Sequence, residues 1–182
     1  MASSDNTSEQ KTIQIPLTRG YFATISIEDA SLFSTGWYVY ISEQNKTQYA
    51  ITSISTPSNK NYSLRMHRII MSRMLGRDLL RTEIVDHKNR NGLDNRRENL
   101  RLTNRTGNAR NVGLRKDSTS GYKGVSWCGR EERWVVNIAV NSKGIYVGRF
   151  TNIHAAAHAY NAAALKYHGE FACLNVIEED NE

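Results

Sequence analysis

An Asp-His pair, Asp86-His87, opens an asparagine-rich stretch that runs to Asn108. Hydrolysis of a phosphodiester needs a base that deprotonates water and a cation that takes up the charge on the leaving oxygen. Histidine is the side chain whose ordinary pKa suits such a base near neutrality, and His87 is the one histidine of this stretch. Asp86 offers a hard oxygen ligand of the kind Mg²⁺ prefers. On this pair alone, a polar loop with a hydrogen-bonded structural histidine is the alternative.

The asparagines extend this chemistry. Proteins usually hold Mg²⁺ by one or two carboxylates, and an amide oxygen is a suitable further ligand. An amide oxygen can also accept the Nδ1 proton of an imidazole, which fixes the tautomer and the plane of the ring. The stretch therefore contains the residue types that metal-assisted phosphodiester hydrolysis requires.

The distribution of charge indicates an anionic partner. The 182 residues carry 24 Lys and Arg against 18 Asp and Glu, a net charge of +6. Residues 64–116 alone carry fourteen basic and five acidic side chains, and the segments on both sides are slightly acidic. Twelve of the fourteen are Arg, which binds phosphate bidentately as Lys cannot. We expect this third of the chain to contact nucleic-acid phosphates, with a solvated basic face as the alternative.

Several classes of protein are excluded. No apolar run approaches the ~18 residues of a membrane span, and the polar N-terminus has no secretory signal. The two cysteines, Cys128 and Cys173, are too far apart for a Cys-x-x-Cys motif, so neither a zinc knuckle nor a disulfide framework is expected. We expect an intracellular, cytoplasmic protein of a bacterial or phage-infected cell, not a secreted one.

The pattern of apolar residues predicts an α+β protein in several parts. A disordered tail at 1–11 precedes a β-rich unit at 12–63, whose strands are expected at 12–17, 21–27, 37–42 and 49–53, with a helical turn at 27–33 and a loop at 56–61. A helix is expected at 64–75 and ends at Gly76.

The candidate residues fall in the next unit, which completes a domain at 64–112. A strand through 84–85 leads into Asp86-His87, and a loop containing Asn91-Gly92 leads to a short strand at 100–102 and a helix at 104–112. A linker is expected at 113–120 and an acidic tail at 176–182.

The last unit, residues 121–175, alternates like a half-buried sheet. Strands are expected at 123–127, 133–140 and 143–150, with Trp134, Val136, Ile138 and Val140 on one face. The alanine-rich segment 153–168 then predicts a helix that can lie close to that sheet.

The central stretch resembles the HNH nucleases, and most closely the phage-type HNH homing endonucleases, in three motif positions. Asp86-His87 ends the first strand, Asn99-Leu100 opens the second, and Asn108 lies on the closing helix. The resemblance implies a ββα-metal finger with His87 as general base, Asn99 as its orienting partner, and Asp86 with Asn108 as metal ligands. Many HNH enzymes have His at the last position, and Asn108 matches the homing subgroup.

Further residues fit the same family. Asn95 matches a common family asparagine, which we interpret as tying the loop rather than as taking part in chemistry. The segment Met66-His67-Arg68 resembles one that lies upstream of this motif. His67 is interpreted as a structural, hydrogen-bonded histidine, with contact to DNA as the alternative. The basic side chains of this domain that we expect at DNA phosphates are Arg65, Arg68, Arg96, Arg97 and Arg101.

The last unit resembles the plant ethylene-response-factor (Apetala-two-type) DNA-binding domain. The motifs appear in order: Gly121 to Trp127, Arg133-Trp134, Tyr146 to Phe150, and Ala155 to Ala163. The resemblance implies a three-stranded sheet, backed by one helix, that enters the major groove of DNA. The positions it places at DNA are Lys123, Ser126, Asn137 and Tyr146, and nearby basic candidates are Arg130, Arg133, Lys143 and Arg149.

Together these features predict a site-directed endonuclease that cleaves double-stranded DNA with one divalent ion, Mg²⁺ or else Mn²⁺. The resemblance implies 5′-phosphate and 3′-hydroxyl ends. A monomer without a protein or membrane partner is expected, and one site per chain favours a nick over a double-strand cut. The rivals are a non-catalytic transcription regulator that keeps the finger as a scaffold, and a non-specific nuclease. The intact Asp86, His87, Asn99 and Asn108 argue against the first, and the C-terminal domain argues against the second.

Overall fold

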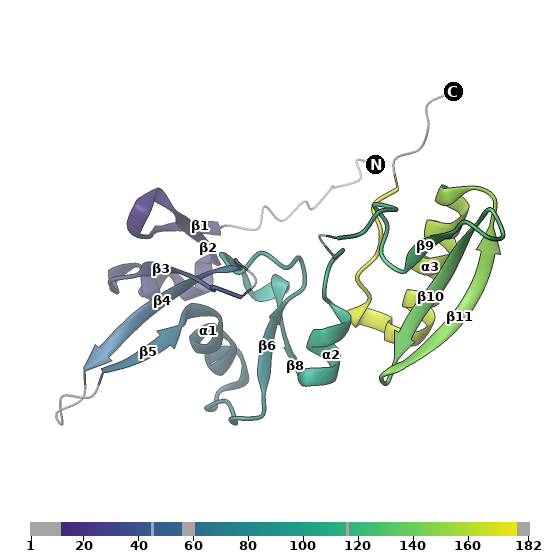
Figure 1. Cartoon of the computed structure of the whole chain (residues 1–182). Coiled ribbons are helices and arrows are strands. Elements are labelled where there is room, and N and C mark those ends of the chain that lie inside the picture. The colour runs from purple at the N-terminus through teal and green to yellow at the C-terminus, as the bar shows by residue number, and fades with distance from the viewer. Residues whose placement is uncertain (1–11, 45, 56–60, 116, 178–182) are drawn as a thin grey trace, which may run out of the picture. The chain divides into compact units, whose positions relative to one another are not determined.

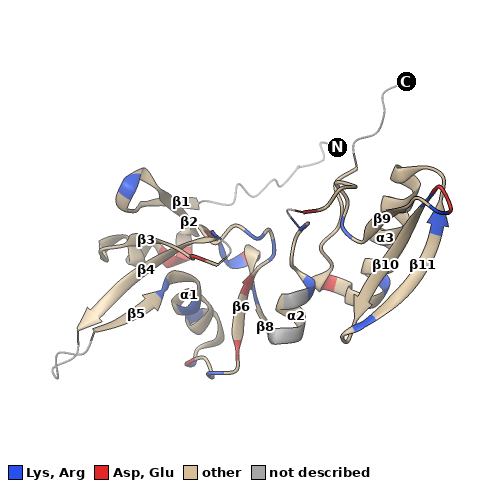
Figure 2. Ribbon diagram, in the orientation of Figure 1, with Lys and Arg blue, Asp and Glu red and all other residues tan. Residues whose placement is uncertain are grey.

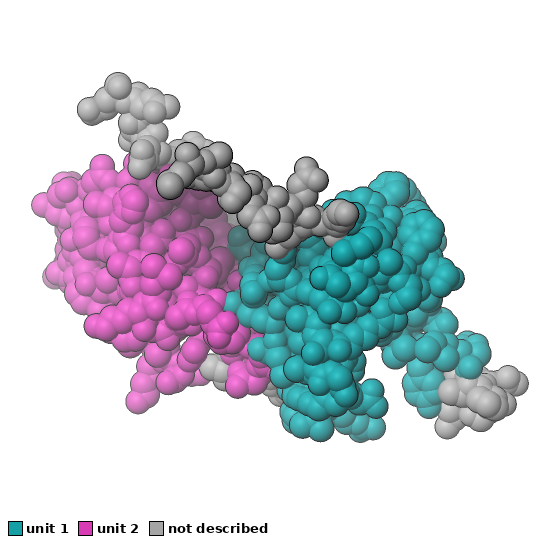
Figure 3. Space-filling view, turned by 180° about the vertical axis from the view of Figure 1, so that it is seen from behind, with its two compact units in different colours: residues 1–102 teal, residues 103–182 magenta. Residues whose placement is uncertain are grey.

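The computed structural model describes residues 12–44, 46–55, 61–115 and 117–177 (Figure 1). The chain forms two compact units, residues 1–102 and 103–182, which Figure 3 colours separately. The predicted N-terminal tail, most of the predicted loop at 56–61 and the end of the acidic tail lie outside the described residues. Within the described part, no helix is long and apolar enough to cross a membrane.

The first unit begins with a small sheet that includes part of the motif loop. Strands β1 (Thr12–Pro16) and β2 (Phe22–Ser26) pair antiparallel, and β2 pairs in parallel with β7 (Asp94–Asn95). A 3-10 helix, Ile27–Ser34, follows β2, as the predicted helical turn. Because Thr24 pairs with Asp94 and Ile25 with Asn95, the N-terminal strands fix the backbone of the loop.

A second sheet leads directly into the first helix. It has the order β3-β4-β5, with strands Tyr38–Ile41, Gln48–Ser55 and Asn61–Arg65. Helix α1 (Met66–Leu75) follows β5 without a loop and ends at Gly76, whose φ of 64° is in the left-handed region. The predicted helix at 64–75 is thus wrong at its start, because Leu64 and Arg65 belong to β5, which we did not predict.

The strands of the motif form a third sheet. β6 (Ile84–His87) and β8 (Leu100–Thr103) form a two-stranded sheet, near the predicted positions. One apolar core joins it to the rest of the first unit, and it includes Ile15, Ile25, Met66, Ile70, Val85 and Leu100. The site is therefore built on the packing of the whole first unit.

The second unit confirms the predicted sheet packed on one helix. Its strands are β9 (Val125–Cys128), β10 (Arg133–Val140) and β11 (Lys143–Phe150), in the order β11-β10-β9, and its helix is α3 (Ile153–His168). Val136 and Ile138 are buried on the face that packs against Ala156 and Ala164, while Asn137 is exposed. Small alanines let the helix approach the sheet closely.

Two further features complete this unit. The short helix α2 (Arg105–Arg110) is shorter than predicted, because Asn104 caps it by accepting from the Gly107 N–H. Gly124 has a φ of 74°, and a Cβ there would lie 2.2 Å from the Tyr160 ring, so only glycine fits. Burial raises the pKa of Tyr160 to about 12.

Candidate functional site

His87 ends β6 and is almost completely buried, at 5% exposure. Its Nε2 lies 3.4 Å from Oδ1 of Asn95, a side chain with no exposed surface. The sequence places Asn99 as the orienting partner of this ring, through Nδ1. The structure instead brings Asn95 to the ring, through Nε2.

Two further aromatic rings pack around His87. The His67 ring lies edge-on to it, with centroids 5.0 Å apart and planes at 88°. The Tyr49 ring lies 6.2 Å from His87 and 5.5 Å from His67. Tyr49 comes from β4 and His67 from α1, so two elements pack on the imidazole that β6 carries. Sequence reasoning did not identify Tyr49, because no motif spacing links β4 to the motif loop.

The buried position of His87 favours the uncharged form of its ring. Burial lowers its pKa below the ordinary histidine value, although the hydrogen bond to Asn95 and the nearby Asp86 and Asp94 act in the opposite direction. A neutral imidazole can accept a proton near neutrality, which is what a general base must do.

His67 is a structural residue by its packing, as expected, but its Nδ1 is not hydrogen bonded. It is only 4% exposed, and Nδ1 has no hydrogen-bond partner in the described part of the chain. Burial, followed by the charge of His87, lowers its pKa well below the ordinary value. His67 is therefore held neutral beside His87.

Asp86 is buried in an ion pair that joins the two strands of the motif sheet. Nε and one terminal nitrogen of Arg101 lie 2.9 and 2.7 Å from its Oδ2. Both side chains are less than a tenth exposed. Arg101 thus fixes one oxygen of the carboxylate that we predicted as a metal ligand, and its guanidinium points into the site rather than toward solvent.

Asn99 organises the motif loop. Its Nδ2 donates to Oδ1 of Asn89 at 3.0 Å and to the Asp94 carbonyl at 2.7 Å, and its Oδ1 accepts from the Asn89 N–H at 3.0 Å. These bonds join the end of the loop to its beginning, beside His87. Asn99 therefore ties the loop together with Asn95, whose Nδ2 donates to the Gly92 carbonyl at 3.5 Å.

Two more arginines predicted at DNA are paired within the protein. Arg96 binds Asp94 through two nitrogens at 2.8 Å and also reaches Glu98 at 2.7 Å. This contact with Arg96 lowers the pKa of Asp94. Arg97 Nε lies 2.7 Å from the fully buried Asp29, in the 3-10 helix after β2.

Arg65 and Arg68, in contrast, have no carboxylate within ion-pair distance in the described ranges. The exposed Arg65 lies over the Tyr49 ring, with Cζ 5.0 Å from its centroid. Arg68 donates to the backbone carbonyl of Glu83 at 2.9 Å, and its charge contributes, after the contacts of Arg77 and Leu80, to the lowered pKa of the Glu83 carboxyl. Figure 2 shows basic positions in blue at the end of β5 and on α1, while strands β3 and β4 carry no charged residue.

The residues predicted to bind metal fall in different units. Asp86 lies in the first unit, and Asn108 lies on α2 in the second, with an exposed side chain. Over the described residues, no group of three or more His, Cys, Asp and Glu could hold an ion. A carboxylate oxygen such as that of Asp86 is a hard donor of the kind that Mg²⁺ prefers together with water and phosphate oxygens.

The DNA-contacting residues predicted in the second unit lie mainly on exposed parts of its sheet. Ser126, Asn137 and Tyr146 are exposed on β9, β10 and β11, and so are Arg130, Arg133 and Lys143. Arg149 pairs with Glu131 at 2.9 Å and lies over the Tyr146 ring, 5.6 Å from its centroid. Lys123 differs, because its Nζ donates to the backbone carbonyls of Arg110 and Val112.

An exposed aromatic residue of this sheet was not predicted at DNA. Trp127 on β9 is 50% exposed and packs edge-on against Trp134, with centroids 4.9 Å apart. From the sequence alone, Trp127 could equally belong to the core or to the surface of the sheet. Its place on β9, beside the exposed Ser126, puts it at the surface of the sheet.

Comparison with known proteins matches two parts of the chain. Residues 65–110 match the family model described as HNH endonuclease. A stretch of 67 residues is 39% identical to the AP2-like ethylene-responsive transcription factor TOE2 of Arabidopsis thaliana. It covers 37% of this chain and 14% of that protein. APETALA2-like protein 2 of Oryza sativa subsp. indica is also 39% identical over 67 residues, and the chain spans 15% of its length.

Proposed function

We propose that this protein is a divalent-metal-dependent DNA endonuclease of the HNH homing type, which hydrolyses phosphodiester bonds at preferred sites. The observation that carries the proposal is the neutral, buried His87 at the end of β6, directly after Asp86 and in contact with Asn95. The Asn95 amide oxygen beside Nε2 can fix the tautomer and the plane of the ring, and the neutral ring can then accept a proton from water. The HNH match over residues 65–110 supports this assignment.

The metal is proposed from the donor set. Asp86 would supply a carboxylate oxygen, fixed by Arg101, and Asn108 an amide oxygen, with Asn108 assigned from the motif alone. A bound Mg²⁺ would stabilise charge on the leaving oxygen. Activity is expected to disappear in EDTA, and Asp86→Ala is expected to raise the Mg²⁺ concentration for half-maximal cleavage or to abolish activity.

We assign the AP2-like similarity to the second unit, whose sheet and helix carry the motifs of that resemblance. A β surface fits the major groove, where base edges can be distinguished. The second unit would then supply sequence preference, and the first unit would supply cleavage. Double-stranded DNA is the partner in both roles.

The direct test is cleavage of a plasmid library with Mg²⁺, with mapping of the nicks. His87→Ala should abolish cleavage and preserve DNA binding, because loss of a general base typically costs ~10²–10⁴-fold in rate. Single-turnover cleavage and a gel shift on the same substrate measure the two properties separately. A His87→Ala variant that cleaves at the wild-type rate would remove His87 from the site.

A transcription regulator is the second candidate, favoured by the similarity to proteins named as transcription factors. It predicts sequence-specific DNA binding without cleavage under any metal. The plasmid assay therefore separates the two candidates in one experiment.

A further inference from the structure

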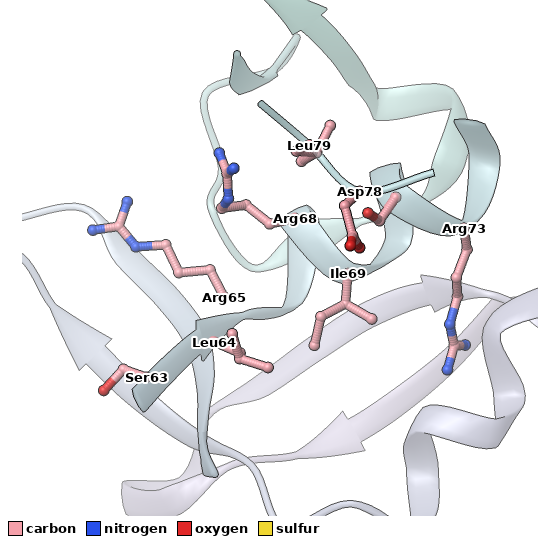
Figure 4. A pocket seen from close by; sticks show the side chains of 9 residues that line it. Ser63, Leu64, Arg65, Arg68, Ile69, Arg73, Asp78 and Leu79 are labelled. Atoms are coloured by element: carbon pink, nitrogen blue, oxygen red, sulfur yellow. The ribbon is translucent and has the colours of Figure 1, made fainter. Parts of the chain in front are cut away.

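A groove of about 680 Å³ lies between β5 and α1, in the first unit. Its polar lining includes Ser63, Arg65, Arg68, Ser72 and Arg73, with Asp78 as the acidic member. Figure 4 shows the guanidinium groups of Arg65 and Arg68 on the same side of the helix, and that of Arg73 on the other side. The groove also runs beside an open sheet edge, because β5 is the last strand in the order β3-β4-β5.

At one end of this groove, the positive charge is available to a ligand. Arg73 lies 3.4 Å from the buried Asp29, whose carboxylate it shares with Arg97, so Arg73 is tied to a carboxylate within the protein. Within the described residues, Arg65 lies over an aromatic ring, and Arg68 donates to the Glu83 carbonyl while Arg77 pairs with the Glu83 carboxylate. Each guanidinium has five N–H donors, so both retain donors for an anion. An anionic ligand should therefore bind at the end formed by Arg65 and Arg68.

This end of the groove adjoins the candidate active site. Arg65 lies over the Tyr49 ring, and the same ring packs on His67 and His87. The two arginines also contribute, after burial and His87, to the lowered pKa of His67, which places their charges close to that ring. The Tyr49 ring thus lies between the charge of Arg65 and His87, the proposed general base.

We propose that Arg65 and Arg68, with the hydroxyl of Ser63, bind the phosphate backbone of DNA beside the bond that is cleaved. This inference rests on the proposed function and names where the substrate strand lies on the first unit. Arginine suits phosphate because its planar fork binds two oxygens at once. Leu64 and Ile69 line the same groove and offer apolar surface to the sugars between phosphates.

The test compares charge-neutralising variants in the full-length protein. Arg65→Gln and Arg68→Gln, alone and together, are compared with Arg81→Gln, which removes the same charge from an exposed residue outside the groove. Binding to a duplex that contains the mapped nick site is measured at several salt concentrations. Each lost phosphate contact should reduce the slope of log K against log[salt] by ~0.9, so the double variant should lose ~1.8. Arg81→Gln should leave the slope unchanged.

Ethylation interference locates the phosphates. The wild-type protein should show interference at phosphates adjacent to the nick, and the double variant should lose that signal alone. Arg65→Gln is the milder single variant, because the Arg65 side chain is exposed and lies over the Tyr49 ring, and Arg65→Lys should restore part of the slope. If the double variant keeps the wild-type salt slope and cleaves normally, the groove is not a phosphate-binding site, and the proposed function is unaffected. A wild-type protein that neither binds nor cuts DNA overturns both.

Discussion

The amide oxygen of Asn95 faces His87 Nε2 at 3.4 Å, which is long for a hydrogen bond. Such contacts often tighten only when substrate binds. Because an acceptor at Nε2 fixes the tautomer and the plane of the ring, removal of this oxygen should leave the base wrongly protonated or wrongly oriented in part of the molecules.

We therefore expect Asn95→Ala to lower the single-turnover cleavage rate by ~10–100-fold, the usual cost of losing an orienting partner. Asn95→Asp keeps an acceptor at the same place and should recover part of the rate. Its negative charge should also raise the pKa of His87, so the acid limb of its pH–rate profile should move to higher pH. Equal rates for Asn95→Ala and wild type would show that Asn95 does not orient the base.

The buried His67 should make the first unit sensitive to acid. Its pKa is lowered in the folded protein, so the unfolded chain binds a proton more readily than the folded one. The stability contributed by the neutral ring is complete above the ordinary histidine pKa of ~6.5 and falls as pH drops below it. Each such histidine can contribute a slope of up to ~1.4 kcal/mol per pH unit in that window.

His67→Phe should keep the ring packing and remove this titration. We expect its free energy of unfolding to fall less steeply than that of wild type between pH 6.5 and 5, as measured by urea denaturation. His154→Phe, which replaces a histidine of the second unit, serves as the control. If wild type and His67→Phe show parallel curves, His67 does not titrate on unfolding in this range.

Strands β6 and β8 are joined by the buried pair of Asp86 and Arg101. Loss of one member leaves an uncompensated buried charge, so Arg101→Met should destabilise the fold by ~3–5 kcal/mol. The double variant Asp86→Asn with Arg101→Met should regain most of that loss, because neither charge remains. Thermal or urea unfolding of the four proteins in the cycle measures the coupling. Arg101→Met with wild-type stability would contradict the paired geometry.

The ion pairs of Arg96, Arg97 and Arg101 change what we expect from replacing these residues. From the sequence, Arg96, Arg97 and Arg101 appear as phosphate contacts, because a linear sequence shows how many cations a segment has but not which carboxylates face them. Asp29 is 68 residues away from Arg97 and yet binds it. Their contact with DNA stays a prediction, and their replacement should lower stability before it changes salt dependence.

Local sequence patterns predicted most elements of the two units. The alternation in β10 and the alanine run of α3 define their own elements, and the bounds of both agree with the structure. β5 was missed because its last residues, Leu64 and Arg65, were assigned to the following helix, although it pairs with the neighbouring strand β4. β7 was missed because it depends on a distant partner. β7 consists of Asp94 and Asn95 alone, and it is a strand because it pairs with β2. The Asp-His pair was recognisable by spacing, while the contacts of Tyr49 and Asn95 with His87 required the fold.

At the scale of the whole molecule, preference for a site should depend on the outer face of the second unit. Asn137→Ala with Tyr146→Ala removes two exposed side chains and leaves the core of that unit intact. Good base contacts are worth ~1–3 kcal/mol each in discrimination, so the variant should spread its nicks over more sequences while still cleaving. Leu165→Ala, on the exposed surface of α3, is the control. Nick mapping on one long duplex reads the result, and an unchanged single site would place specificity in the first unit.

The parallel pairing of β2 with β7 has a consequence for protein engineering. A fragment that begins at residue 64 would contain Asp86, His87, Asn95 and Asn99, but would lack β2, which holds the backbone of Asn95, and Asp29, which holds Arg97. Such a fragment, moved into another protein as a cutting module, would leave a strand edge and a guanidinium without their partners. A transplantable module would have to start at β1 and include the N-terminal sheet. The second unit has an apolar core of its own, so recombination in this chain can exchange the second unit more readily than the first.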